Sequence, residues 1–95
     1  MKGYIVCVYK NINDLNILKD YAIKAKAVVE KFEGKFLIRG GKKITTEGED
    51  WERTTVIEFS SFKKANDFFY SKEYQDAHKI LGDTVKRHHH IIEGC

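Results

Sequence analysis

Hydrophobic residues along the chain follow the spacing of β-strands in some segments and of helices in others. Tyr4–Tyr9 is β-branched and aromatic on both faces, which is typical of a central strand covered on two sides. Apolar residues at spacings of three and four from Leu15 to Phe32 indicate a long amphipathic helix. The remaining patterns predict strands over 35–39 and 54–59, a helix over 62–70, a short helix ending at Gly82, and a strand over 85–93.

Capping residues set the limits of the predicted helices. Small polar residues that accept hydrogen bonds from free backbone N–H groups precede each helix, and glycine follows two of them. The predicted N-caps are Asn13 or Asp14, Ser60 or Ser61, and Ser71, and the predicted stops are Gly34 and Gly82. Gly40-Gly41 ends the second strand, where we expect a bend or a positive φ.

The order β-α-β-β-α-β predicts a ferredoxin-like α+β fold. Two β-α-β halves with right-handed crossovers give a four-stranded antiparallel sheet with the helices on one face. Strict alternation places Arg39 on the side of the second strand opposite Phe36 and Ile38. The residues expected on the bare face of the second and third strands are Leu37, Arg39, Val56 and Glu58. We expect a second subunit's sheet to cover this face, with a ligand cavity between the two sheets.

Composition limits the classes of protein to consider. We expect one domain over residues 1–95. The net charge of +3 is spread over mixed pairs such as Lys19-Asp20 and Lys72-Glu73, which indicates a solvated surface and argues against a nucleic-acid binder. No segment has the length of a membrane span, and no signal peptide is visible. Cys7 and Cys95 have no metal-binding spacing, and a disulfide between them is possible but not indicated. With no signal peptide visible, we expect a cytoplasmic protein.

Several motifs together resemble one known family. They are Glu33-Gly34-Lys35-Phe36-Leu37-Ile38-Arg39-Gly40-Gly41, Glu47-Gly48 shortly before Trp51, Val56-Ile57-Glu58-Phe59, Ser71-x-x-Tyr74-Gln75, and Ile92-Glu93-Gly94. This combination is similar to the family catalogued as domain of unknown function 1330. The resemblance implies a ferredoxin-like dimeric α/β barrel and a homodimer. It implies no reaction, although the wider superfamily includes cofactor-free monooxygenases, muconolactone isomerases and haem enzymes.

The chain departs from the family pattern in two places. Ser60-Ser61 stands where relatives often have a proline. Lys79-Ile80-Leu81, after the tyrosine–glutamine motif, lacks an arginine that the resemblance leads us to expect. If that arginine helps bind an anionic ligand in relatives, its loss argues against such a site in this chain.

Arg39 and Glu58 are candidates for ligand binding. A guanidinium and a carboxylate on neighbouring strands of a half-dry cavity could orient a polar group or relay a proton. The alternative is a cross-strand ion pair that only balances two charges at a dimer interface.

The run His88-His89-His90 is unusual. On a strand, His88 and His90 project to one face and His89 to the other. The two outer imidazoles could hold zinc or nickel with His78 or a group from a partner chain as a third ligand, but no Asp, Glu or Cys is clearly placed to complete the site. The alternatives are a polar strand, or His89 acting as a general base in the cavity. We therefore expect no cofactor.

Two aromatic residues complete the candidate site. Trp51 is isolated in a polar loop, where it could close over a ligand or pack against a partner subunit. Tyr9 could direct its hydroxyl into the cavity. The leading hypothesis is a homodimer that binds a small, partly apolar molecule through Arg39, Glu58, Trp51, His89 and Tyr9. The alternatives are a cofactor-independent monooxygenase or isomerase using His89 and Glu58, and a structural or regulatory dimer without a ligand.

Overall fold

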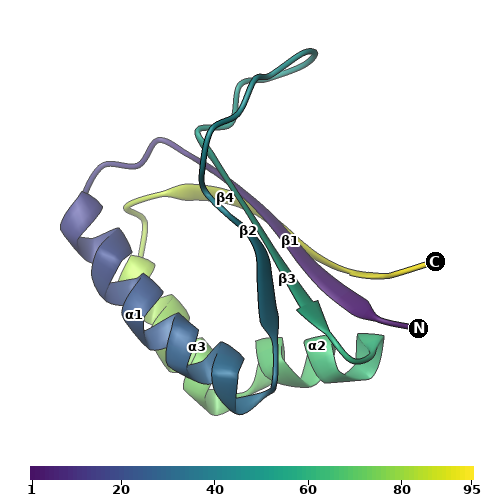
Figure 1. Ribbon diagram of the computed structural model, residues 1–95. Coiled ribbons are helices and arrows are strands. Elements are labelled where there is room, and N and C mark those ends of the chain that lie inside the picture. Colours follow the sequence, from purple (N-terminus) through teal and green to yellow (C-terminus); the bar gives the residue numbers. More distant parts are fainter.

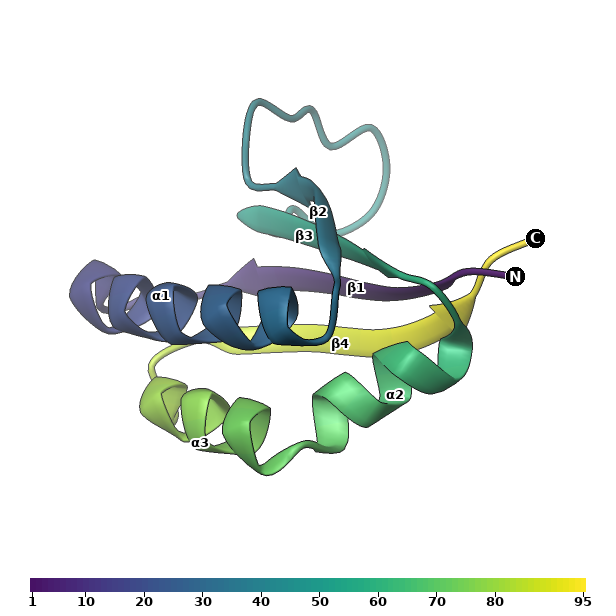
Figure 2. The ribbon, with the colours of Figure 1, turned by 60° about the horizontal axis from the view of Figure 1, so that its bottom comes forward.

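Three helices pack on one face of a four-stranded antiparallel sheet in the computed structural model, which describes residues 1–95 (Figures 1 and 2). The elements are β1 (Gly3–Lys10), α1 (Leu15–Lys31), β2 (Lys35–Arg39), β3 (Arg53–Phe59), α2 (Phe62–Tyr70), α3 (Lys72–Leu81) and β4 (Lys86–Glu93). The strand order is β2-β3-β1-β4. The predicted ferredoxin-like α+β fold is confirmed, with the short third helix as a separate element.

Strand β1 lies between β3 and β4, as its apolar pattern on both faces predicts. Ile5, Cys7 and Tyr9 face the helices and are buried in the core. The alternate residues, including Val6 and Val8, face the other way and are half-buried. Both faces of this strand therefore need apolar surroundings, and the helices supply them on one side only.

Helix α1 begins after Asp14, whose carboxylate accepts hydrogen bonds from the backbone N–H groups of Asn16 and Ile17 at 2.9 and 3.2 Å. The predicted apolar stripe is correct in part. Its buried residues are Tyr21, Ala25, Val28 and Val29, whereas Leu15 is 73% exposed. Leu15, the first residue of the helix, therefore does not reach the core, whereas Leu18 packs against it.

Gly34 is required for packing rather than for helix termination. The left-handed residue after α1 is Glu33, with φ of 60°. A Cβ atom on Gly34 would lie only 2.7 Å from the ring of the core residue Phe59. The close approach of the chain to this ring explains the glycine better than the predicted helix stop does.

Helices α2 and α3 are separated by a single residue, Ser71. Its hydroxyl donates to the carbonyl of Phe68 at 2.7 Å and accepts from the N–H of Tyr74 at 3.1 Å, so one side chain ends α2 and begins α3. Ser61 caps α2 in the same way through Lys64. These contacts fix Phe68 and Tyr74 in the core, where both are 1% exposed.

A β-bulge in β2 changes which residues face the helices. Phe36 pairs with Ile57 on the helix side of β3, but the register then shifts, so that Ile38 pairs with Val56 and Arg39 with Thr55. The extra residue reverses which side of the sheet each later residue of β2 faces. The prediction that Arg39 lies on the bare face is therefore wrong, because it assumed a regular strand.

The sheet face opposite the helices, called the open sheet face below, is uncovered in the isolated chain. Its centre is apolar through Val6, Val8 and Val56. Its margins carry Ile38 and Ile92, which are 45% and 51% exposed. The loop between β2 and β3 extends away from both layers (Figure 1) and begins at Gly40-Gly41, whose φ angles are positive as predicted. None of the three helices has the length and apolar character needed to cross a bilayer.

Candidate functional site

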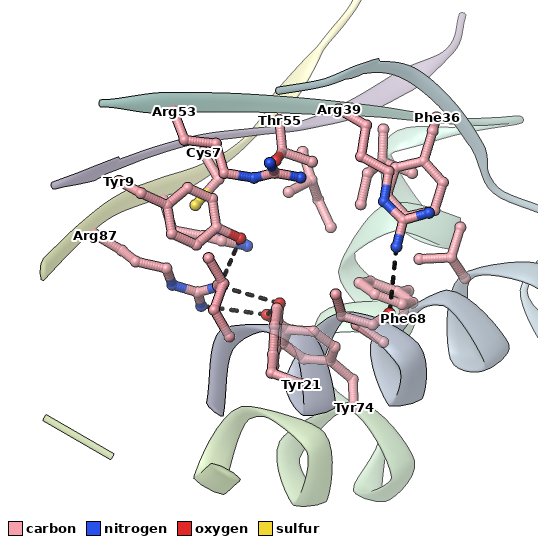
Figure 3. Close-up of a pocket in the computed structure, with 17 residues that line it drawn as sticks. Cys7, Tyr9, Tyr21, Phe36, Arg39, Arg53, Thr55, Phe68, Tyr74 and Arg87 are labelled. Atoms are coloured by element: carbon pink, nitrogen blue, oxygen red, sulfur yellow. Dashed lines mark hydrogen bonds between the residues drawn. The ribbon is translucent and has the colours of Figure 1, made fainter. Parts of the chain in front are cut away.

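A cavity of about 40 Å³ lies within the subunit, between the helix side of the sheet and helices α1 and α3 (Figure 3). Since a buried water needs about 10–15 Å³ on this measure, the cavity has room for two or three waters or a small functional group. Most of its lining is apolar, with Ile5, Ala25, Ile57 and Phe68 among the walls. The lining residues that carry a polar or charged group, the largely apolar tyrosines and Cys7 included, are Cys7, Tyr9, Tyr21, Arg39, Arg53, Thr55, Tyr74, Arg87 and His89.

Arg87 of β4 contacts tyrosine hydroxyls from three different elements. Its guanidinium donates to Tyr21 of α1 at 3.0 Å, to Tyr74 of α3 at 3.2 Å and, at a long 3.5 Å, to Tyr9 of β1. The hydroxyls of Tyr21 and Tyr74 also form a hydrogen bond of 2.8 Å with each other. Figure 3 shows these groups converging at one end of the cavity.

Burial keeps the phenols of this cluster neutral. It raises the pKa of Tyr21 to about 12 and raises the pKa values of Tyr9 and Tyr74 as well. An arginine is always charged in a protein. Arg87 is therefore a cation solvated by neutral hydroxyls, with no carboxylate in contact.

Arg39 of β2 lines the part of the cavity away from Arg87, whereas Arg53 of β3 lies beside Tyr9, its neighbour across the strands (Figure 3). The Arg39 guanidinium lies 4.4 Å from the centre of the Phe36 ring and donates to the carbonyl of Ala22 at 3.4 Å. Arg39 is exposed, and Arg53 and Ala22 are half-buried, so the cavity approaches solvent on this side. The bulge in β2 is what directs Arg39 to this position.

His89 lines the same cavity from β4, with its ring centre 5.0 Å from that of Phe69. Burial, followed by the nearby charge of Arg87, lowers the pKa of His89 to about 3. The imidazole is therefore neutral at physiological pH. A neutral imidazole can accept or donate a hydrogen bond, but one with so low a pKa is a weak base.

Of the residues predicted from the sequence, Tyr9, Arg39 and His89 are brought together around this cavity. Glu58 is not among its lining residues. It lies on the open sheet face, where it accepts from Lys2 at 3.0 Å and from the hydroxyl of Tyr4 at 3.1 Å. The expectation that Arg39 and Glu58 share a face is therefore wrong, because the bulge separates them by the thickness of the sheet.

Trp51 also lies outside the cavity lining. Its ring packs beneath Lys10, with the ammonium 4.7 Å from the ring centre, and Lys10 is further paired with Glu49. These contacts hold the end of the β2–β3 loop against β1. Contact of Trp51 with a partner subunit stays a prediction.

The histidine run alternates across β4 as predicted. His88 and His90 pair with Val8 and Val6, whose side chains are on the open sheet face, and their ring centres are 5.3 Å apart. His78 is instead on α3, with its ring 6.1 Å from that of Tyr74, so the sheet separates it from the pair. No group of three or more histidine, cysteine or acidic side chains is arranged to hold a metal ion.

The sequence interpretation missed Arg53, Arg87, Tyr21 and Tyr74 as cavity residues. One signal was available: Arg87 lies two positions from His89 on the same strand, so any face that includes one includes the other. Tyr21 and Tyr74 have the spacing of core residues, and their polar role depends on helices whose relative placement no local pattern shows.

The sequence profile of one family, described as "Domain of unknown function (DUF1330)", matches residues 2–95. The chain belongs to this family. No curated protein matches it. The DUF1330 assignment confirms the resemblance based on the motifs, and it brings no assigned activity with it.

Solved structures show the same fold at low sequence identity. A protein of unknown function from Rhodopseudomonas palustris has a TM-score of 0.80 and 14% identity, over 99% of this chain and 82% of that one. A dimeric, ferredoxin-like protein of unknown function from Bacteroides fragilis has a TM-score of 0.67 and 19% identity, over 98% and 96%. A putative antibiotic biosynthesis monooxygenase from Caulobacter crescentus has a TM-score of 0.63 and 12% identity, over 99% and 89%. At these identities the likeness shows the fold alone.

Proposed function

We propose that this DUF1330 protein is a small homodimer that binds a small, partly apolar molecule in the cavity within each subunit. The observation that supports this most is the lining, in which apolar walls surround a few convergent polar groups. Small-molecule sites in proteins have this composition. The proposal moves the site from between two sheets, where the sequence placed it, to the helix side of one sheet.

The size of the cavity limits what it can hold. About 40 Å³ accommodates one functional group of a ligand and not a whole drug-sized molecule. A larger ligand must therefore place only its end among Tyr21, Tyr74 and Arg87, with its body directed past Ala22 and Arg39 toward solvent. Alternatively, α1 must move away from the sheet when the ligand enters.

The dimer is proposed from the open sheet face. Val6, Val8 and Val56 form an apolar strip in the middle of the sheet, flanked by Ile38 and Ile92. A second copy of the same sheet would cover this strip, and two related structures are described as dimeric. Cys7 is buried and unpaired, which suits a reducing compartment such as the cytoplasm.

The proposal is tested by titrating ¹⁵N-labelled protein with a panel of small neutral and charged aromatic and aliphatic molecules, followed by NMR. We expect shifts at Thr55, Tyr21 and Tyr74 for some members. The variant Ala22→Phe, which fills the solvent side of the cavity, should abolish them. The matched control Ala27→Leu enlarges an exposed alanine of the same helix and should leave binding unchanged. Shifts confined to the open sheet face, or binding unaffected by Ala22→Phe, would refute the cavity as the site.

A cofactor-independent enzyme is the second candidate, because a neutral imidazole, His89, lies in the same cavity. In such an enzyme His89 would take a proton from an acidified C–H bond of the substrate, and the carbanion would be left beside Arg87. The reaction would appear as deuterium exchange into the bound molecule in D₂O, and His89→Gln should stop it. The low pKa of His89 makes it a weak base, so ligand binding is the better supported function.

A further inference from the structure

All three arginines of the chain line the one cavity. They are Arg39 of β2, Arg53 of β3 and Arg87 of β4, so three different strands contribute one each. No aspartate or glutamate is among the lining residues. The cavity therefore has an excess of positive charge that the chain itself does not neutralise.

The salt bridges in the rest of the protein show that arginines are used only at the cavity. Every salt bridge of the protein uses a lysine as its cation, and none uses an arginine. The acidic side chains pair with lysines, accept from backbone N–H groups as Asp14 and Glu52 do, or face solvent, while the three guanidiniums stay without a carboxylate partner. Like charges around an apolar cavity repel one another, and a bound anion would offset that repulsion.

Hydrogen-bond donors in the cavity are also in excess. Tyr21 and Tyr74 share one hydrogen bond, which uses one of their two hydroxyl protons, and both oxygens accept from Arg87. The second proton of this pair has no protein acceptor. Since both phenols stay protonated, this O–H group and the guanidinium are available to the same acceptor.

We infer that the cavity selects a small organic anion, a carboxylate attached to a short apolar or aromatic body, with its two oxygens held by Arg87 and the free tyrosine hydroxyl. This inference rests on the proposed function and adds the ligand class. A planar carboxylate matches the guanidinium fork. The apolar walls formed by residues such as Ile57 and Phe68 suit the apolar atoms next to the carboxylate, while the rest of the body extends toward solvent, and they disfavour a free, multiply charged ion. Arg39, on the solvent side, would draw the anion toward the cavity.

The family resemblance led us to expect an arginine after Gln75, and anion binding in this chain does not need it. In this chain the positive charges come from the strands, not from the segment Lys79-Ile80-Leu81. Its absence there does not remove the anion site.

The test compares carboxylic acids with their own primary amides by NMR titration at pH 7 and constant ionic strength. The pairs are acetate with acetamide, benzoate with benzamide, and phenylacetate with phenylacetamide, and inorganic phosphate is the additional probe. We expect at least one acid to bind roughly tenfold or more tightly than its amide, as charge-assisted hydrogen bonds require. Arg87→Met should remove this preference, and Arg87→Lys should retain part of it.

The matched control is Lys86→Gln, which removes one positive charge from the neighbouring residue of β4 on the open sheet face. This variant should keep the preference for the acid over the amide. That result would show that the preference comes from contact with Arg87 and not from the net charge of the protein. If Arg87→Met does not fold, Arg39→Gln alters only an exposed residue and should lower the preference by a smaller factor.

The outcomes separate the two proposals. Equal binding of acids and amides at the cavity would overturn the anion inference and leave the proposed binding function intact. An unchanged preference in both Arg87→Met and Arg39→Gln would overturn the arginine assignment, and phosphate binding as tightly as the acids would overturn the carboxylate. The absence of any shift at the cavity with acids and amides alike would refute the proposed function itself.

Discussion

His89 should make the protein less stable as the pH falls below 6.5. Its ring lies between Phe69, Tyr74 and the guanidinium of Arg87, with His78 nearby on α3 and Cys7 opposite it on β1. Burial first, and then the charge of Arg87 and the nearby imidazole of His78, lower the pKa of His89 from 6.5 to about 3. The unfolded chain therefore binds a proton between pH 6.5 and 3 that the native protein does not, and stability must fall as the pH is lowered through this window.

The magnitude follows from the shift. Between pH 6.5 and pH 5, a range of about 1.5 pH units, only the unfolded chain binds the His89 proton. At about 1.36 kcal/mol per pH unit, the free energy of unfolding falls by about 2 kcal/mol. Urea denaturation at pH 7 and pH 5 measures it. Wild type should lose about 2 kcal/mol more than His89→Gln over this range, or roughly 8–16 °C in Tm for a domain of this size.

The comparison is His90→Gln, which removes an imidazole from the opposite face of the same strand. Because that face is the proposed dimer interface, the variant is compared with wild type at equal dimer content, checked by gel filtration, and should keep the loss of stability assigned to His89. A direct check is the NMR titration of the His89 ring protons, which should show no protonation down to pH 5. A midpoint near 6.5 for His89, or the same pH dependence in wild type and His89→Gln, would show that the ring is solvated and that the cavity is more open than the structure indicates.

Three further substitutions test the packing, the polar cluster and the dimer. Gly34→Ala places a methyl group 2.7 Å from the ring of Phe59 and should lower the free energy of unfolding by about 1–3 kcal/mol in urea; a change below about 0.5 kcal/mol would argue against close packing there. Tyr74→Phe removes a hydroxyl with two hydrogen-bond partners and should cost about 1–3 kcal/mol, whereas the exposed control Tyr70→Phe should cost almost nothing. Val6→Asp, in the middle of the open sheet face, should convert a dimer into a monomer in light scattering coupled to gel filtration; a wild-type monomer, or an unchanged dimer, would refute that interface.

The fold was predictable because its signals are local. Tyr4–Tyr9 is apolar on both faces and became the central strand, and Ser61 and Ser71 cap the helices that they were expected to cap. Motif spacing added the family, which the match over residues 2–95 confirms. Each of these features depends on residues close together in the sequence, where backbone hydrogen bonding and side-chain period decide the outcome.

The site was predicted less well, and the bulge in β2 is the main reason. One extra residue after Phe36 moved Arg39 to the helix side and left Glu58 on the open sheet face. A sequence pattern with period two contains no mark of such a shift. The contacts of Arg87 with Tyr21 and Tyr74 join residues 66 and 13 positions apart, so they arise from helix placement and not from any local motif.

The most direct test of this account is to locate a bound carboxylate by NMR. Intermolecular NOEs should be measured between benzoate, or whichever acid of the panel binds best, and the assigned methyl and ring protons of the labelled protein. A carboxylate bound in the cavity should give NOEs to Ile57, Thr55, Tyr21 and Tyr74. NOEs to Val6, Val8 and Val56 instead would place the ligand on the open sheet face, between subunits, and would contradict the central claim that the site lies within one subunit.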